Sequence, residues 1–133
     1  MKYKTPDNLL YSRTHEWVKL TKNGLVVVGI TDYLQNRLHK IEYLELPKEG
    51  KMVKAGEALA IVEALKTSSE IYSPISGRVI EVNKELEKNP RRIHEDPYGD
   101  GWIVKVKPIN WESEAKALLN HEEYRSMLSA SDS

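Results

Sequence analysis

The stretch from Gly56 to Asn83, GEALAIVEALKTSSEIYSPISGRVIEVN, decides the fold of this chain. Three strand-like runs within it are bounded by Gly, Pro, Ser and Asn, a pattern typical of short strands separated by turns. These predicted strands are Ala58–Val62, Glu70–Tyr72 and Arg78–Val82. The segment Glu63–Ser69 is too polar to continue a buried strand, so it predicts a hairpin with Lys66 at or near its tip.

A short internal repeat flanks this hairpin. Pro47–Val53 (PKEGKMV) recurs 27 residues later as Pro74–Ile80 (PISGRVI), and the turn residues Gly56 and Asn83 close both copies in the same register. Proline at a turn, and Gly or Asn where a positive φ is needed, suit such corners. The repeat predicts two similar β-units related by a pseudo-twofold axis, with Lys66 displayed at one end.

Size and composition set broad limits. The 133 residues suit a single domain, 1–133, long enough to bury a core. Lys and Arg together number 20, as do Asp and Glu, so no net field predicts nucleic acid or an anionic membrane as a partner. The absence of cysteine excludes disulfides, thiolate metal sites and a cysteine nucleophile. Redox sulfur chemistry would therefore require an attached group.

The N-terminal segment carries no recognisable targeting signal. Residues 1–10 lack an apolar leader region, and the longest apolar run falls far short of a membrane span. The recognisable domain begins about ten residues in, which leaves little room for an organelle transit peptide. We therefore expect a cytoplasmic protein from a bacterium or archaeon.

The chain before the repeat predicts strands and one helix. Trp17–Leu20 and Leu25–Ile30 form two predicted strands joined by Thr21–Gly24, whose Asn-Gly pair is a strong hairpin signal. The second of these strands is apolar on both faces, so we expect it in the centre of an antiparallel sheet. Thr31 can cap a helix of two or three turns, and Glu42–Leu46 predicts a further strand.

The chain after the repeat predicts short helices and one strand. We expect a helical turn ended by Pro90, a last strand, two helices headed by Asn110 and Asn120, and a frayed tail. In order, these segments are Glu85–Lys88, Trp102–Val106, Trp111–Leu119, the second helix as far as Leu128, and the tail Ser129–Ser133. The C-terminal helical segment thus covers residues 110–128.

Neither a metal site nor a catalytic constellation is predicted. The four histidines are scattered without ligand spacing, and the glycines and proline of Asp96–Gly101 explain that segment as a turn. No nucleophile stands beside a base, and no Gly-rich loop would hold a phosphate. A lysine on a stiff hairpin suits a carrier instead, because tethering a group raises its effective concentration at partner active sites.

Eight strings of the chain occur together in a characteristic order and spacing. They are Glu63–Lys66, Ser69–Glu70, Ser73–Gly77, Val82–Asn83, Thr14–Val18, Val28–Tyr33, Glu45–Pro47 and Glu95–Trp102. Together they closely resemble the H-protein family of the glycine cleavage system, over a core of residues 10–128. The resemblance implies a mainly β fold with small helices (α+β). The core of that fold is a lipoyl/biotinyl-type barrel-sandwich hybrid, built of two pseudo-symmetric half-sheets. An N-terminal hairpin and helix and C-terminal helices are added to this core.

The resemblance implies that Lys66 carries lipoate as a swinging arm, joined by an amide to its ε-amino group. In the family, pyridoxal-phosphate glycine decarboxylase loads the arm with an aminomethyl group and the aminomethyltransferase removes it. Dihydrolipoyl dehydrogenase then reoxidises the arm. A lipoate ligase or lipoyl transferase attaches the cofactor, whose dithiolane supplies the sulfur that this sequence lacks. The chain would thus be a carrier component rather than an enzyme.

The resemblance also implies site residues. Thr14, Glu16 and Glu70 match residues that hold the loaded arm in a surface cleft, where two carboxylates suit a cationic aminomethyl group. Glu63 and Gly77 match positions that guide the lipoylating enzyme. Gly77 is also explained simply as a turn residue. No catalytic and no metal-binding residue is implied.

The chain departs from the family pattern in a few places. The family usually has Gly-Asp where this chain has His39-Lys40, and Ser-Val where it has Ala64-Leu65. Arg91-Arg92 and His94 stand where the family is less basic, and the charge is balanced where the family is acidic. Because surface charge selects partners more than it sets the fold, these changes bear on the partner set.

Alternative functions follow from the same residues. One is an H-like lipoate-binding protein that carries sulfur intermediates for a heterodisulfide-reductase-like complex. Another is an unmodified interaction or scaffold protein with the same fold. A biotin carrier is a weaker option, because Leu65 and Thr67 stand where biotinylated hairpins usually have methionine on both sides of the lysine.

Overall fold

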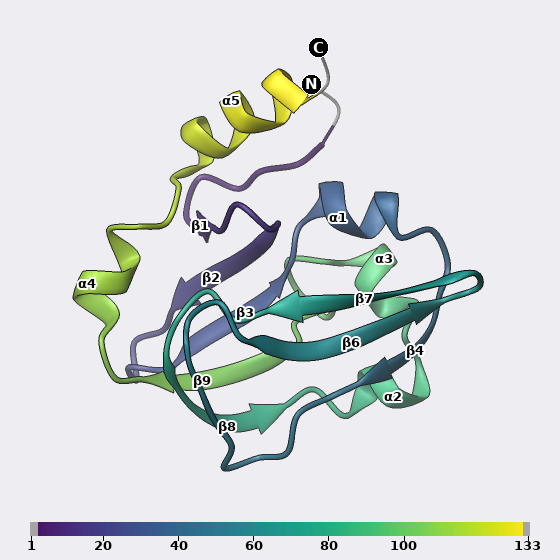
Figure 1. Ribbon diagram of the computed structural model, residues 1–133, viewed down its shortest axis with the longest axis horizontal. Coiled ribbons are helices and arrows are strands. Elements are labelled where there is room, and N and C mark those ends of the chain that lie inside the picture. The colour runs from purple at the N-terminus through teal and green to yellow at the C-terminus, as the bar shows by residue number, and fades with distance from the viewer. Residues whose placement is uncertain (1–2, 132–133) are drawn as a thin grey trace.

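The computed structural model describes residues 3–131, which form two antiparallel sheets and several short helices, as Figure 1 shows. The strands are β1 Leu10–Tyr11, β2 Glu16–Leu20, β3 Val26–Ile30, β4 Ile41–Glu45, β5 Met52–Val53, β6 Ala58–Ala64, β7 Thr67–Tyr72, β8 Gly77–Val82 and β9 Val104–Pro108. The helices are α1 Asp32–Arg37, α2 Glu85–Lys88, α3 Arg92–Glu95, α4 Trp111–Ala115 and α5 His121–Ser131. The predicted fold class, mainly β with small helices, is confirmed.

The two sheets differ in size. The larger has the strand order β1-β2-β3-β9-β8-β5, the smaller has the order β4-β6-β7, and all of these neighbours are antiparallel. β3 lies inside the larger sheet, as its apolar sequence predicts. The hairpin of β2 and β3 extends one sheet only. The described strands therefore form two unequal sheets rather than two matched halves or one closed barrel.

One hydrophobic core fills the space between the sheets. Leu44, Val62 and Ile71 of the smaller sheet are at most 1% exposed and pack in one cluster with inward-facing valines of the larger sheet. Since side chains alternate along a strand, Ile61 and Glu63 on either side of Val62 face outward. Each fully buried aliphatic side chain contributes about 1.5–3 kcal/mol. This burial fixes the base of the β6–β7 hairpin.

The two copies of the repeat lie beside each other, because β5 and β8 are antiparallel neighbours. Only the first copy has left-handed turn glycines, with φ of 94° at Gly50 and 89° at Gly56. The equivalent Gly77 and Asn83 are buried and do not have positive φ. Gly77 is the first residue of β8, so its interpretation as a turn residue is wrong.

Helix α1 begins as predicted and ends early. The Thr31 hydroxyl accepts a hydrogen bond from the Leu34 amide at 3.2 Å, which confirms the N-cap. The helix has six residues, fewer than predicted, because His39 beyond it adopts a left-handed φ of 56°. The family resemblance places a glycine at this position, and the positive φ gives the physical reason.

The C-terminal part differs more from the prediction. Helix α3 was not predicted, β9 starts at Val104 instead of Trp102, and α4 ends at Ala115. Asn120 does head α5: its Oδ1 accepts the Glu123 amide at 2.8 Å, and Glu123 Oε1 accepts the Asn120 amide at 2.9 Å. Because α5 continues through residue 131, the predicted frayed tail is wrong for residues 129–131. Residues 132–133 lie outside the described range.

A second, smaller hydrophobic cluster joins α5 to the N-terminal strands, and Figure 1 shows this helix beside β1. Its buried members are Leu9, Tyr11, Trp17, Tyr33, Leu119, Tyr124 and Leu128. The rings of Tyr11 and Tyr124 stack with centroids 4.6 Å apart. Across residues 3–131, no helix has the length and apolar character that spanning a membrane requires.

Candidate functional site

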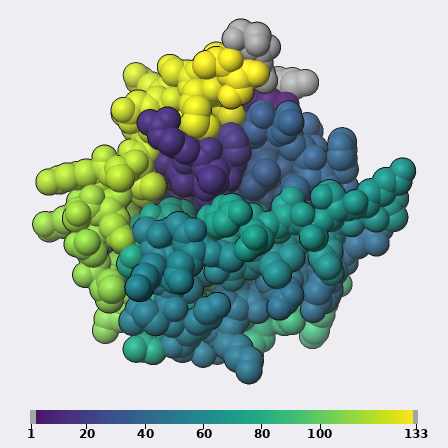
Figure 2. Space-filling model, viewed as in Figure 1, coloured from purple at the N-terminus to yellow at the C-terminus, as the bar shows by residue number. Residues whose placement is uncertain are grey.

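The turn between β6 and β7 consists of Leu65 and Lys66, with Ala64 and Thr67 paired at the strand ends. Both turn residues are exposed, Leu65 by 74%. Figure 2 shows this hairpin, in teal, projecting from the body of the molecule. Within residues 3–131 the Lys66 amine takes part in no hydrogen bond or ion pair. The predicted position of Lys66 at a hairpin tip is confirmed, and its amine is accessible for acylation.

The two residues expected to guide a lipoylating enzyme lie in different surroundings. Glu63 is exposed on the outward face of β6, opposite Ser68 and close to the tip. Gly77 is buried at the start of β8, beyond the end of β7 that is farthest from Lys66. A Cβ atom there would collide with the backbone carbonyl of Lys107, so only glycine fits without a shift. The structure brings Glu63, and not Gly77, to Lys66.

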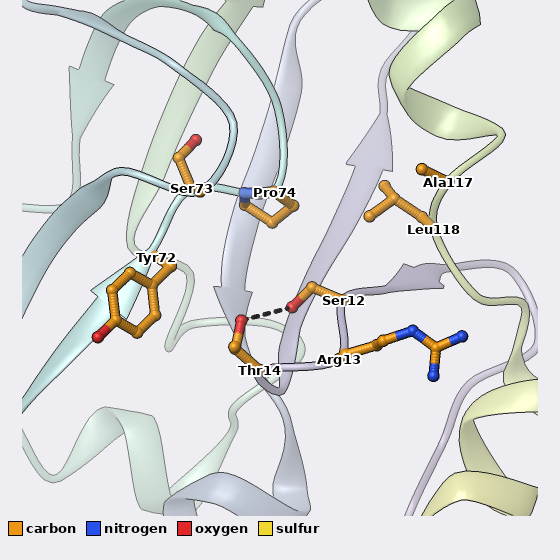
Figure 3. Close-up of a pocket in the computed structure, with 9 residues that line it drawn as sticks. Ser12, Arg13, Thr14, Tyr72, Ser73, Pro74, Ala117 and Leu118 are labelled. Carbon is orange, nitrogen blue, oxygen red and sulfur yellow. Dashed lines mark hydrogen bonds between the residues drawn. The ribbon is translucent and has the colours of Figure 1, made fainter.

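A groove runs along β7, beside the segment Ser12–Glu16, termed the Ser12–Glu16 loop, which joins β1 to β2 and includes the first residue of β2. It consists of two hollows of about 800 and 390 Å³ that share Arg13, Thr14 and Tyr72, and it is termed the β7 groove here. The larger hollow is also lined by His15, Leu34, Ile61, Ser68, Ser69 and Glu70, and the smaller by Ser12, Gly56, Ser73, Pro74, Ala117 and Leu118. Figure 3 shows the smaller hollow, in which the Ser12 and Thr14 hydroxyls are hydrogen-bonded at 3.3 Å and Tyr72 lies on a different segment.

Glu16 lies beneath the groove wall and is 1% exposed. Its Oε1 accepts hydrogen bonds from the hydroxyls of Thr14 and Ser12, the latter at 2.6 Å, and its Oε2 accepts the Tyr72 amide at 3.1 Å. Glu16 is therefore buried rather than exposed, and it lines neither hollow of the groove. The carboxylate instead ties the Ser12–Glu16 loop to the end of β7.

The surroundings of Glu16 also change its ionisation. Burial raises the pKa of its carboxyl group, because a charge is poorly solvated there, and the hydrogen bonds from Ser12, Thr14 and the Tyr72 amide offset part of that effect. Three donors around one carboxyl group favour the ionised form, which only accepts hydrogen bonds. The hydrogen bonds and the burial therefore act on the pKa of Glu16 in opposite directions, and the effect of burial is the larger.

Thr14 and Glu70 do line the groove. Thr14 donates its hydroxyl proton to Glu16, so the oxygen has lone pairs left to accept a hydrogen bond. Glu70 is exposed on β7, four residues from Lys66, or about 13 Å along the strand. A lysine side chain spans only about 6 Å. The amine alone does not reach this carboxylate, so the groove is useful only to a longer attached group.

Among the lining residues that sequence reasoning missed are Ser12, Arg13 and Tyr72. Alternation along β7 could have identified Tyr72, because it follows Glu70 by two residues and shares its face. No sequence signal places Ser12 under the groove, since its role depends on the folded loop. The Arg13 side chain points away from Tyr72 in Figure 3, so its charge is not directed into the smaller hollow.

Comparison with known proteins decides the family. The model of the family described as glycine cleavage H-protein matches residues 9–131. This chain belongs to that family. A relative from Pyrococcus abyssi, named probable glycine cleavage system H protein, is 52% identical over 126 residues, which cover 95% of this chain and 93% of the relative. A glycine cleavage system H protein from Acinetobacter baumannii is 50% identical over 117 residues, covering 88% and 94%.

A solved structure agrees with this assignment. The crystal structure of a glycine cleavage system H protein from Mycobacterium marinum superposes with a TM-score of 0.85 at 35% identity, covering 93% of this chain and 98% of that one. The region matched to the H-protein family contains the whole β6–β7 hairpin and every residue that lines the β7 groove. The family assignment therefore covers the candidate site as well as the fold.

Proposed function

We propose that the chain is a lipoyl-carrier protein of glycine cleavage, with lipoate attached to Lys66 as a swinging arm. The observation that carries the proposal is an exposed amine, unpaired within residues 3–131, on a two-residue turn in a member of the H-protein family. In the covalent step the lipoate carboxyl carbon bonds to Nζ, the amine loses a proton, and the group that activates the carboxyl leaves. Bound lipoate supplies redox-active sulfur, which a chain without cysteine lacks.

The β7 groove is the proposed resting place of the loaded arm. An aminomethyl cargo is cationic, and the exposed Glu70 carboxylate offers it a charge-assisted hydrogen bond. Thr14 offers a second acceptor, strengthened because its own proton is donated to Glu16. Glu16 acts through Thr14 and the Tyr72 amide rather than by touching the cargo.

The proposed partners are those of the glycine cleavage system. They are glycine decarboxylase, aminomethyltransferase, dihydrolipoyl dehydrogenase, and the lipoate ligase or lipoyl transferase that modifies Lys66. The proposal is supported by the relatives, which are named for glycine cleavage. Glu63, which is exposed near the tip, would contact the lipoylating enzyme. The buried Gly77 would act only indirectly, by allowing β8 to pack closely against β9. The chain itself would catalyse none of these reactions.

Intact mass tests the attachment site. After reaction with a lipoate ligase, the wild-type chain should gain one lipoyl group, and Lys66→Arg should gain none. Lys54→Arg is the matched control, because Lys54 is another exposed lysine in a turn, and it should be modified like the wild type. Both variants should melt within a few degrees of the wild type, since neither side chain is buried. Full modification of Lys66→Arg would assign the arm to another lysine.

Glycine–bicarbonate exchange tests the pathway. With glycine decarboxylase from the same source, the lipoylated chain should support exchange, and unmodified chain and Lys66→Arg should not. Full lipoylation without exchange would contradict the glycine-cleavage role and favour the sulfur carrier that serves a heterodisulfide-reductase-like complex. A chain purified from its native host without any lipoyl group would favour the unmodified scaffold.

A further inference from the structure

A buried hydrogen-bond network connects the last helix to the groove loop. Tyr124 of α5 is fully buried, and its hydroxyl lies 2.8 Å from His15 Nδ1 and 2.7 Å from Thr31 Oγ1. The Thr31 amide in turn donates to the His15 carbonyl at 3.0 Å. Three separate segments, the Ser12–Glu16 loop, the start of α1 and the first turn of α5, thus meet at the Tyr124 hydroxyl.

His15 is the strained member of this network. Its φ is 75°, a left-handed conformation that costs a non-glycine residue about 1 kcal/mol or more. The ring packs on Tyr33, with centroids 4.6 Å apart, and against the edge of Tyr124 at 5.7 Å. Burial first, and the Arg37 charge second, lower the pKa of His15. A neutral imidazole and a neutral phenol can form a hydrogen bond with each other, so this buried contact requires no charged group.

The position of His15 sets the position of its neighbours. Thr14 and Glu16 flank it directly, and the loop is closed by the Ser12 amide on the Glu16 carbonyl at 2.9 Å and by the His15 amide on the Ser12 carbonyl at 3.2 Å. Releasing His15 would let the loop relax from its left-handed turn. The Thr14 hydroxyl that faces the β7 groove would then lose its fixed place.

We propose that Tyr124 is a positioning residue of the β7 groove: through His15, its hydroxyl holds the Ser12–Glu16 loop in the shape that presents Thr14 to the loaded arm. The C-terminal helix thereby determines how well the groove shields the cargo from water. The part of this inference that concerns shielding of the cargo rests on the proposed carrier function. The part that concerns the conformation of the Ser12–Glu16 loop does not depend on that function.

Tyr124→Phe tests the inference, because it removes one hydroxyl and keeps the ring. Tyr11→Phe is the matched control: Tyr11 stacks on Tyr124 in the same buried cluster, and its hydroxyl donates to the Pro6 carbonyl at 2.6 Å instead of to the groove loop. Amide hydrogen exchange at Ser12, His15 and Glu16 should be about tenfold faster in Tyr124→Phe, and unchanged in Tyr11→Phe. The His15 ring resonances in an NMR spectrum should shift in Tyr124→Phe alone.

Loss of cargo tests the second half. In lipoylated protein loaded with glycine decarboxylase, hydrolytic release of formaldehyde should be about fivefold faster in Tyr124→Phe than in Tyr11→Phe, at equal lipoylation by mass. Faster exchange with unchanged release would overturn the shielding role. Equal behaviour of the two variants in both measurements would overturn the whole inference. Failure of the wild type to load would contradict the proposed function alone, because the exchange measurement needs no arm.

A double-mutant cycle distinguishes an effect that Tyr124 exerts through His15 from a general destabilisation of the fold. His15→Asn removes the imidazole and keeps a residue that tolerates positive φ. If Tyr124 acts through His15, the two substitutions together should speed loop exchange no more than either does alone. If the increases in exchange rate caused by the two single substitutions instead multiplied in the double variant, Tyr124 would stabilise the loop independently of His15. The inference would then be wrong.

Discussion

The turn Leu65–Lys66 and the loop Ser12–Glu16 are both hairpin connections next to the β7 groove, yet the first leaves its charged group in solvent and the second buries one. The Lys66 amine has no partner within the described residues, whereas Glu16 is 1% exposed and accepts three hydrogen bonds. The difference suits the roles proposed for the two segments. A group that an enzyme modifies has to be reachable, and acceptors that hold a cargo have to be fixed.

A large difference in stability is expected between variants of Glu16 and Glu63, the carboxylates beside these two connections. Glu16→Ala should lower the free energy of unfolding by about 3 kcal/mol, because it leaves the Ser12 and Thr14 hydroxyls and the Tyr72 amide without their acceptor. Glu63→Ala, on an exposed face near the tip, should change it by less than about 0.5 kcal/mol. Chemical denaturation measures both. Equal losses of unfolding free energy in Glu16→Ala and Glu63→Ala would contradict the difference in burial between the loop and the turn.

A smaller effect is expected from two threonines. Thr14→Val removes a hydroxyl that donates to Glu16 and should cost about 1 kcal/mol of stability, with faster loss of cargo from the loaded arm. Thr67→Val, beside the turn, should cost less than about 0.5 kcal/mol, because Thr67 is exposed. Denaturation and formaldehyde release are the two measurements. A Thr14→Val variant that keeps its cargo normally would remove Thr14 from the proposed site.

The pH dependence of stability offers a sharper test of Glu16 burial. Burial raises the folded-state pKa of its carboxyl group above the ordinary value of 4.5, so the unfolded chain releases this proton first as pH rises. Between the two pKa values the unfolded state binds fewer protons, and stability from this group falls with rising pH. Glu16→Gln should therefore become more stable relative to wild type as pH rises from 4.5 through this window. If the difference in free energy of unfolding between Glu16→Gln and wild type did not change with pH, the raised pKa of a buried Glu16 would be contradicted.

The histidines act in the opposite direction. Burial lowers the pKa of His15 and of His94 below the ordinary value of 6.5, so the unfolded state takes up these protons first as pH falls. Stability is therefore lost as pH falls below 6.5. His15→Asn should reduce this loss. A loss of the same size in His15→Asn would mean that His15 does not contribute to it.

The smallest effect is expected at the tip itself. Leu65→Ala should change the free energy of unfolding by less than about 0.5 kcal/mol, because the side chain is 74% exposed. Leu59→Ala on the same strand is the contrast: Leu59 is 3% exposed, and its truncation should cost about 2–5 kcal/mol. Thermal melting of both variants checks this. A large effect at Leu65 would reveal tertiary contacts that the turn does not have in this structure.

The sequence predicted what depends on nearby residues. Strand-like runs on either side of a polar segment located the β6–β7 hairpin, and Thr31 and Asn120 marked two helix starts correctly. Burial of Glu16 could not be foreseen, because its Tyr72 partner lies 56 residues away. The packing of Gly77 depends on a carbonyl of β9, which no local pattern contains. Thr14 and Glu70 were identified by family resemblance and not by pattern.

The place of β7 in its sheet gives Glu16 a second consequence. β7 is an outer strand, and such strands carry unpaired amides and carbonyls to which a foreign strand can add. The Glu16 carboxylate occupies the Tyr72 amide on that border. To pair with this amide, an incoming strand would have to displace the buried Glu16 carboxyl group, which accepts three hydrogen bonds. The same side chain that closes the Ser12–Glu16 loop thus also removes one backbone donor from the exposed border of the smaller sheet.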